Sequence, residues 1–144
     1  MIAQSIEKIR RSTREVDVAL GQGVVARRRL CDDIASAVVQ EGPMPFPVPE
    51  GADRVAWVLE YAPDVLIREG GDGREVDMAL SGIRLETEGE MAGTVVVDGV
   101  LTEDTRFFPK GTEVHVPILR VLNPEALSGF VEDALAQKAR ERAS

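Results

Sequence analysis

The sequence contains few of the residue types that most chemical sites require. Its 144 residues include one cysteine, Cys31, and one histidine, His115, so the chain forms neither an internal disulfide nor a zinc site built from several Cys and His ligands. Aromatic residues make up only 4% of the chain, which predicts a core of Val, Leu, Ile and Ala. We expect no metal ion and no cofactor.

Long apolar runs and excess positive charge are also missing. No run approaches the roughly 20 apolar residues of a transmembrane helix, and charges occur too early in residues 1–17 for the apolar core of a signal peptide. The net charge of −8 disfavours direct binding to nucleic acid or to an anionic membrane surface. We therefore expect a soluble protein of the cytoplasm or another intracellular setting, the interior of a virion included.

Helical periodicity dominates the first forty residues, which we treat as an N-terminal helical arm (residues 1–40). Spacings of four and three residues alternate along one stripe, in which Thr13 is the polar member and the apolar members are Ile2, Ile6, Ile9, Val16 and Leu20. Gly21 and Gly23 then permit either a hinge or a full reversal into a helical hairpin. Because the arginine-rich second segment offers little apolar cover, we expect another subunit to contact the stripe.

Residues 41–53 are predicted to form a proline-rich connector. Four prolines occur between Pro43 and Pro49, and such a segment can neither continue a helix nor serve as a central strand. Beyond it the apolar period changes to two. Apolar residues alternate along residues 54–61, which predicts a half-buried strand. The connector therefore precedes an antiparallel β domain spanning residues 54–122.

Turn and bulge signals divide this β domain into several strands. Residues 65–80 are typical of a hairpin with a glycine-rich turn, and the alternation slips at Gly82, which indicates a bulge. A second turn is predicted at Asp98 and Gly99. Pro117 indicates that the last strand lies at an edge of the sheet or contains a bulge.

Residues 123–144 are predicted to form a C-terminal helix that packs with the β domain as one compact unit. Asn123 is expected to cap the helix, with Pro124 at its first position and an apolar stripe that begins at Leu127. The whole order predicts an α+β fold: an N-terminal helix or helical hairpin, a proline-rich connector, an antiparallel β-sandwich or barrel-like sheet, and a C-terminal helix.

Cys31 and His115 are the obvious candidates for chemistry, and each also has a structural interpretation. Three arginines precede Cys31 and would lower the pKa of a neighbouring thiol. On a helix, however, Cys31 lies on the apolar side, and we expect Arg29 to pair with Asp33 one turn further on. His115 alternates with valines and is expected at the surface. The carboxylates are abundant but unclustered, so no catalytic, cofactor-binding or metal-ligating residue is predicted.

Two hypotheses on function follow. The first is a non-enzymatic structural or assembly protein, which forms a homo-oligomer or belongs to a larger particle such as a phage head–tail or decoration component. It depends on the apolar stripe, the connector and the lack of a catalytic motif. The alternative is a small-molecule-binding or catalytic β domain with a pocket near Trp57, Tyr61 and His115. A deep pocket that gathers those three residues would favour the alternative.

Overall fold

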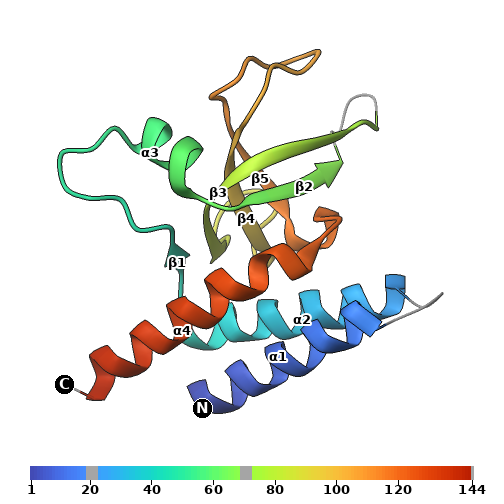
Figure 1. Cartoon of the computed structure of the whole chain (residues 1–144), viewed down its shortest axis with the longest axis vertical. Helices are drawn as coiled ribbons and strands as arrows, with labels where there is room; N and C mark the ends of the chain where they lie inside the picture. Colours follow the sequence, from blue (N-terminus) through green and yellow to red (C-terminus); the bar gives the residue numbers. More distant parts are fainter. Residues whose placement is uncertain (19–22, 69–72, 144) are drawn as a thin grey trace.

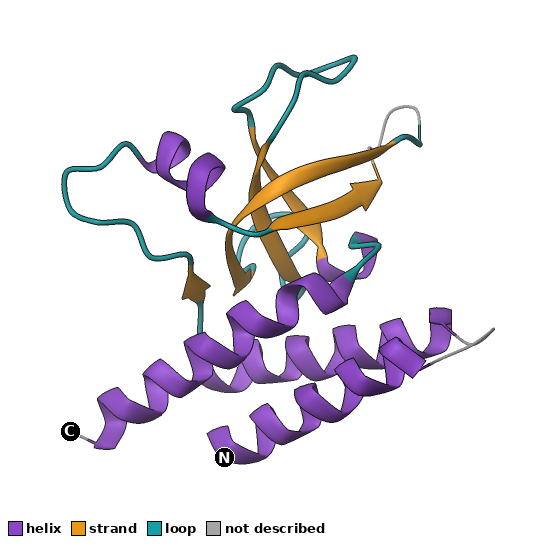
Figure 2. Cartoon of the chain, viewed as in Figure 1, coloured by secondary structure: helices purple, strands orange, loops and turns teal. Residues whose placement is uncertain are grey.

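The computed structural model describes residues 1–18, 23–68 and 73–143. In this part of the chain, four α-helices surround an antiparallel sheet of five strands, which confirms the predicted α+β class (Figures 1 and 2). The helices are α1 (Ile2–Val18), α2 (Gly23–Glu41), α3 (Arg54–Tyr61) and α4 (Ser128–Ala143). The strands are β1 (Met44–Pro45), β2 (Asp64–Arg68), β3 (Glu75–Leu85), β4 (Val95–Leu101) and β5 (Glu113–Pro117).

Helices α1, α2 and α4 form one layer that covers one face of the sheet (Figure 1). Helices α1 and α2 pack against each other, so the helical-hairpin form of the N-terminal arm is the one that the structure adopts. The core lies between this layer and the sheet, and its largest fully buried side chains include Ile9, Leu30, Ile34, Met78, Leu80 and Leu135. As the composition predicts, this core is aliphatic.

Residues 54–61 form helix α3, so the strand predicted there is wrong. The same residues also satisfy a helical spacing, because Val55, Val58, Leu59 and Ala62 lie on one face and pack on the sheet. Asp53 begins the helix, since its side chain accepts a hydrogen bond of 3.0 Å from the backbone N–H of Ala56. Helix α3 lies on the sheet face opposite α1, α2 and α4 (Figure 1).

Strand β4 is continuous through Asp98 and Gly99, so the turn predicted at these two residues is also wrong. The strand lies between β3 and β5 in the sheet order β1-β3-β4-β5. Gly99 serves close packing, because a Cβ atom there would lie 2.5 Å from Sδ of Met78 and 3.0 Å from the carbonyl oxygen of Ala79. A glycine after an aspartate therefore marks a crowded position here.

The proline-rich connector contributes to the sheet at one point. Strand β1 pairs Met44 and Pro45 with Ile83 and Gly82 of β3, as a two-residue edge strand. The predicted irregularity at Gly82 is confirmed, since the β3–β4 register shifts between Leu80 and Gly82. A Cβ atom at Gly82 would lie 3.3 Å from the Met44 carbonyl oxygen, so glycine allows the connector to approach β3 closely.

The end of the sheet closes on itself in a barrel-like manner. Strand β2 pairs with β3, and an isolated bridge joins Ile67 of β2 to Val121, beyond the predicted edge strand β5. Asn123 does not cap a helix with its side chain. Its Oδ1 instead accepts a hydrogen bond of 2.8 Å from the backbone N–H of Leu66, and the chain enters α4 through a 3₁₀ turn, η2 (Pro124–Leu127). The side chain of Asn123 therefore binds the backbone of β2 and does not cap the helix as predicted.

Candidate functional site

Asp98 lies near the middle of β4 and is 9% exposed, which makes it one of the few charged residues in the interior of the described chain. Strand alternation directs Val95 and Val97 toward the helical layer, so Asp98 lies on the other face, the face that α3 covers in part. A buried carboxylate is costly unless charged or hydrogen-bonding partners surround it. The neighbouring strands supply those partners.

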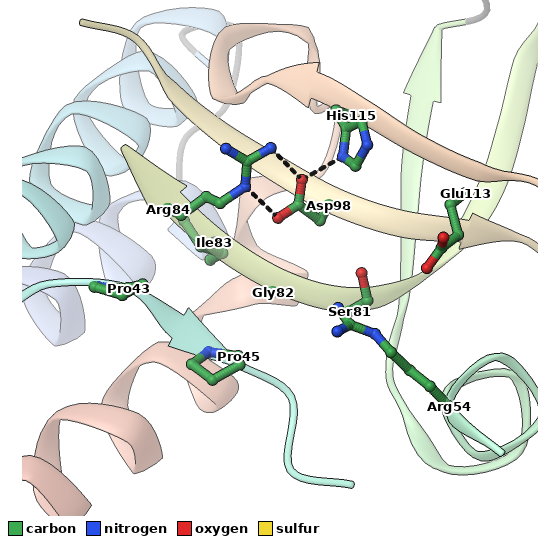
Figure 3. A pocket seen from close by; sticks show the side chains of 10 residues that line it. All are labelled: Pro43, Pro45, Arg54, Ser81, Gly82, Ile83, Arg84, Asp98, Glu113 and His115. Carbon is green, nitrogen blue, oxygen red and sulfur yellow. Dashed lines mark hydrogen bonds and ion pairs between the residues drawn. The ribbon is translucent and has the colours of Figure 1, made fainter. Parts of the chain in front are cut away.

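Arg84 of β3 and His115 of β5 both contact the Asp98 carboxylate (Figure 3). Arg84 donates from Nε to Oδ2 at 2.9 Å and from Nη2 to Oδ1 at 3.3 Å. His115 is the residue paired with Asp98 across the β4–β5 ladder, and its Nδ1 lies 2.5 Å from Oδ1. Three strands thus bring one carboxylate, one guanidinium and one imidazole into contact.

Arg84 is fixed as a cation by two acidic partners. Its Nη1 donates to Oε2 of Glu86 at 2.7 Å, in addition to the bonds with Asp98. These hydrogen bonds, first with Asp98 and then with Glu86, raise the pKa of Arg84. The hydrogen bond from Arg84 lowers the pKa of Glu86, assisted by the backbone N–H of Glu88. Three of the five N–H bonds of the guanidinium are used in this way, which leaves two for another acceptor.

The contact with Asp98 determines the proton position of neutral His115. An ionised carboxylate only accepts hydrogen bonds, so Nδ1 carries the proton and donates it. The other ring nitrogen, Nε2, then carries a lone pair. The side chain is 51% exposed, in agreement with the surface position that we predicted, but its ring is oriented by a buried partner. His115 therefore offers one acceptor at a defined place.

These groups line a cavity of about 370 Å³ on the α3 side of the sheet. One wall is the proline-rich connector, the floor is formed by β3 and β4, and the remaining walls are β5 and the start of α3 (Figure 3). The lining residues are Pro43, Pro45, Arg54, Ser81, Gly82, Ile83, Arg84, Asp98, Glu113 and His115. The cavity therefore combines a polar floor and rim with two rigid prolines.

Only one of the three predicted pocket residues lies in this cavity. His115 lines it, whereas Trp57 and Tyr61 are absent from its lining and contact each other on α3, with ring centroids 4.3 Å apart. The reason is the helical form of residues 54–61, which brings Arg54 of the same segment to the cavity in their place. This cavity therefore gathers only His115 of the three side chains.

The apolar stripe of the N-terminal arm is covered largely by the chain itself. Ile9 and Val16 are buried, and Ile2 and Ile6 are partly buried against the same core, whereas Leu20 lies outside the described residues. The polar member Thr13 is satisfied too, since its Oγ1 contacts Oγ of Ser128 at 2.8 Å. The described members of the stripe thus contact the chain's own core, and an oligomer interface along the stripe stays a prediction.

Cys31 is buried, as predicted from its place on the apolar side of a helix. Its Sγ donates to the carbonyl oxygen of Ile118 at 3.7 Å. Burial is the main reason that the pKa of this thiol is raised to about 11, so the preceding arginines do not activate it. The pair predicted between Arg29 and Asp33 is replaced by contacts with α1: Arg29 pairs with Glu15 at 2.9 Å, and Asp33 accepts from Ser12.

Arg84 and Asp98 are the functional candidates that sequence reasoning missed. Asp98 is a charged residue inside the apolar run of residues 95–101, and such a residue signals a buried polar partner. The wrong prediction of a turn at Asp98 and Gly99 hid this indication, because a turn residue is expected to be exposed to solvent. Once β4 is a single strand, its pairing with β3 and β5 brings Arg84 and His115 to the same carboxylate.

The fold and the site together define an α+β domain with a polar cavity on one sheet face. When the chain is compared with known proteins, no family model, no curated protein and no solved structure matches it. Among the described residues, no group of three or more His, Cys, Asp or Glu side chains is placed to hold a metal ion. A search of the same residues for a helix long and apolar enough to cross a membrane finds none.

Proposed function

We propose that this chain is a non-enzymatic binding protein that holds a small polar ligand in the cavity beside Asp98. The observation that carries the proposal is the position of Asp98, which contacts Arg84 and His115 at once from a buried site in the central strand. Such an arrangement holds two free N–H groups and one lone pair in place before any ligand arrives. Pre-organised groups of this kind reduce the cost of binding.

The described contacts of His115 include no nucleophile of the chain itself. General-base catalysis requires a substrate group or a nucleophile within hydrogen-bond reach of the free ring nitrogen. Ser81 is the hydroxyl residue that lines the cavity, and the described contacts include no hydrogen bond between it and His115. The nearest partner of the imidazole is the carboxylate that orients it. We assign His115 a binding role, since its free Nε2 offers a polar ligand a hydrogen-bond acceptor.

A ligand screen by NMR would test this proposal. We expect some members of a library of small polar molecules to shift the amide signals of Ser81, Arg84 and His115 in the wild-type chain. The variant Asp98→Asn removes the charge that holds both partners, so it should weaken that binding by about tenfold or more. The control is Asp17→Asn on the exposed side of α1, which should leave binding unchanged.

Two outcomes would contradict the proposal. One is a library without any member that shifts those signals in the wild type. The other is a ligand that binds Asp98→Asn and the wild type equally well.

A second candidate function is assembly, through self-association or with other subunits of a particle. It is favoured by exposed valines on both helices of the hairpin, at the ends that approach the connection: Val18 is 75% exposed, Val24 82% and Val25 59%. Neighbouring exposed apolar side chains are typical of contact surfaces. Light scattering on the wild type and on Val24→Asp with Val25→Asp tests it. An oligomer that the double variant dissociates supports assembly, and a monomeric wild type excludes self-association.

A further inference from the structure

Two opposite charges line the cavity without meeting each other. Arg54 is the first residue of α3, and Glu113 is the first residue of β5. Within the described chain, neither side chain makes an ion pair or a side-chain hydrogen bond. Figure 3 shows both side chains at the cavity. Both charges are therefore available to a ligand. Arg84 and Asp98, by contrast, already form an ion pair with each other.

The charges of the cavity lining balance. Arg54 and Arg84 supply two positive charges, and Asp98 and Glu113 supply two negative ones, while His115 is neutral when it donates from Nδ1 only. A ligand that carries only one charge could pair with either Arg54 or Glu113, and the other side chain would keep an uncompensated charge. A ligand that carries one charge of each sign, by contrast, can engage Arg54 and Glu113 together.

We propose that the cavity binds a zwitterionic α-amino acid, whose carboxylate pairs with Arg54 and whose ammonium group pairs with Glu113. The forked guanidinium of Arg54 matches a carboxylate, and the carboxylate of Glu113 accepts from an ammonium group. This inference rests on the proposed function, because it names the ligand of the same cavity. It adds two residues, Arg54 and Glu113, to the binding role of Arg84 and His115.

The remaining polar groups indicate the ligand's side chain. Arg84 has two N–H groups left after its bonds with Asp98 and Glu86, and Nε2 of His115 carries a lone pair. A carboxamide complements both, because its carbonyl oxygen accepts from Arg84 and its NH₂ group donates to His115. A side-chain amide, as in glutamine, is therefore the class that the cavity fits.

Isothermal titration of the full chain with L-glutamine tests the inference, with three matched compounds. Glutaramate lacks the ammonium group, 4-aminobutanamide lacks the carboxylate, and norleucine lacks the amide. We expect glutamine to bind about tenfold more tightly than each of the three, since each lacks one charged or hydrogen-bonding group. Equal affinity for glutamine and any one of them would overturn the corresponding contact.

Two charge-neutralising variants distinguish the two ends of the ligand. Glu113→Gln should weaken the binding of glutamine and 4-aminobutanamide but not that of glutaramate. Arg54→Gln should weaken the binding of glutamine and glutaramate but not that of 4-aminobutanamide. The control Glu90→Gln changes an exposed carboxylate outside the cavity and should change none of these affinities. A loss that is uniform across the compounds would contradict the assignment.

The outcomes also separate this inference from the proposed function. If glutamine and its analogues do not bind, but other small polar molecules shift the signals of Arg84 and His115, the amino-acid assignment fails and the binding cavity stands. If no molecule shifts those signals, both fail.

Discussion

Asp98 is the residue on which the account of the site depends, and its chemistry predicts the effect of removing each partner. Replacing Arg84 by Gln leaves a carboxylate of low exposure without its cation, so we expect Arg84→Gln to reduce the free energy of unfolding by about 1–3 kcal/mol. His115→Ala should cost less than about 1 kcal/mol, because that side chain is half-exposed. Urea unfolding of both variants measures the difference. Equal costs would contradict the part-buried ion pair between Arg84 and Asp98.

Cys31 shows at the same scale how burial decides the reactivity of a group. Its folded pKa of about 11 lies above the reference value of 9.0, so the unfolded chain loses this proton at lower pH than the folded chain. The stability due to the neutral thiol is complete below pH 9.0 and is lost as the pH rises toward 11. We expect a contribution of about 2–3 kcal/mol. Urea unfolding between these pH values measures it.

Cys31→Ala is the control for this effect. The variant has no thiol, so its unfolding free energy should fall less steeply over the same alkaline range than that of the wild type. Parallel pH profiles for the two proteins would show that the thiol is not held neutral by burial.

At the scale of single elements, the sequence predicts most strongly where local patterns and tertiary partners agree. The hairpin of β2 and β3, the bulge at Gly82 and the edge position of β5 were all visible in the alternation and in the prolines. The helical form of residues 54–61 could not be predicted in this way, because their apolar residues fit both the period of two of a strand and the spacing of a helix. The cap from Asp53 and the cover that α3 provides for β3 and β4 decided the outcome.

Gly99 offers an element-scale test of the continuous strand β4. In Gly99→Ala the new methyl group would collide with Met78 and approach the Ala79 carbonyl, so we expect a loss of about 1–3 kcal/mol in unfolding free energy. The control is Gly129→Ala in α4, where the new Cβ would meet no atom within 4 Å beyond its chain neighbours and the adjacent backbone of its own helix, and alanine there should stabilise the helix by up to about 1 kcal/mol. Thermal unfolding compares the two. A neutral Gly99→Ala would mean that β4 does not pack on Met78 in this way.

At the scale of the whole molecule, side chains of the N-terminal hairpin and of the sheet pack together in one core. The described apolar members of the predicted stripe do pack in the core, but the sequence pattern could not show that α4 covers them, because α4 lies more than a hundred residues further along the chain. The same limit explains the missed cavity. Arg54, Arg84, Asp98 and His115 come from four different elements, and only the strand register and the position of α3 join them.

Ile9 tests whether the hairpin is part of the folded unit. This side chain is fully buried in the chain's own core, so we expect Ile9→Asp to lower the unfolding free energy by about 3 kcal/mol or more, or to prevent folding. Lys8→Asp, on the exposed side of α1, is the control and should have little effect. Circular dichroism during urea unfolding measures both. If Ile9→Asp changed only the native mass in solution, the stripe would be an intermolecular contact after all.

The most direct test of the central claim, a cavity organised by Asp98, is the protonation state of the His115 ring. Long-range ¹H–¹⁵N NMR spectra of the ring, recorded at alkaline pH, distinguish its two nitrogens. We predict a protonated Nδ1 and an unprotonated Nε2 in the wild type, and loss of this single form in Asp98→Asn. A wild-type ring protonated mainly on Nε2, or one that Asp98→Asn leaves unchanged, would contradict the account.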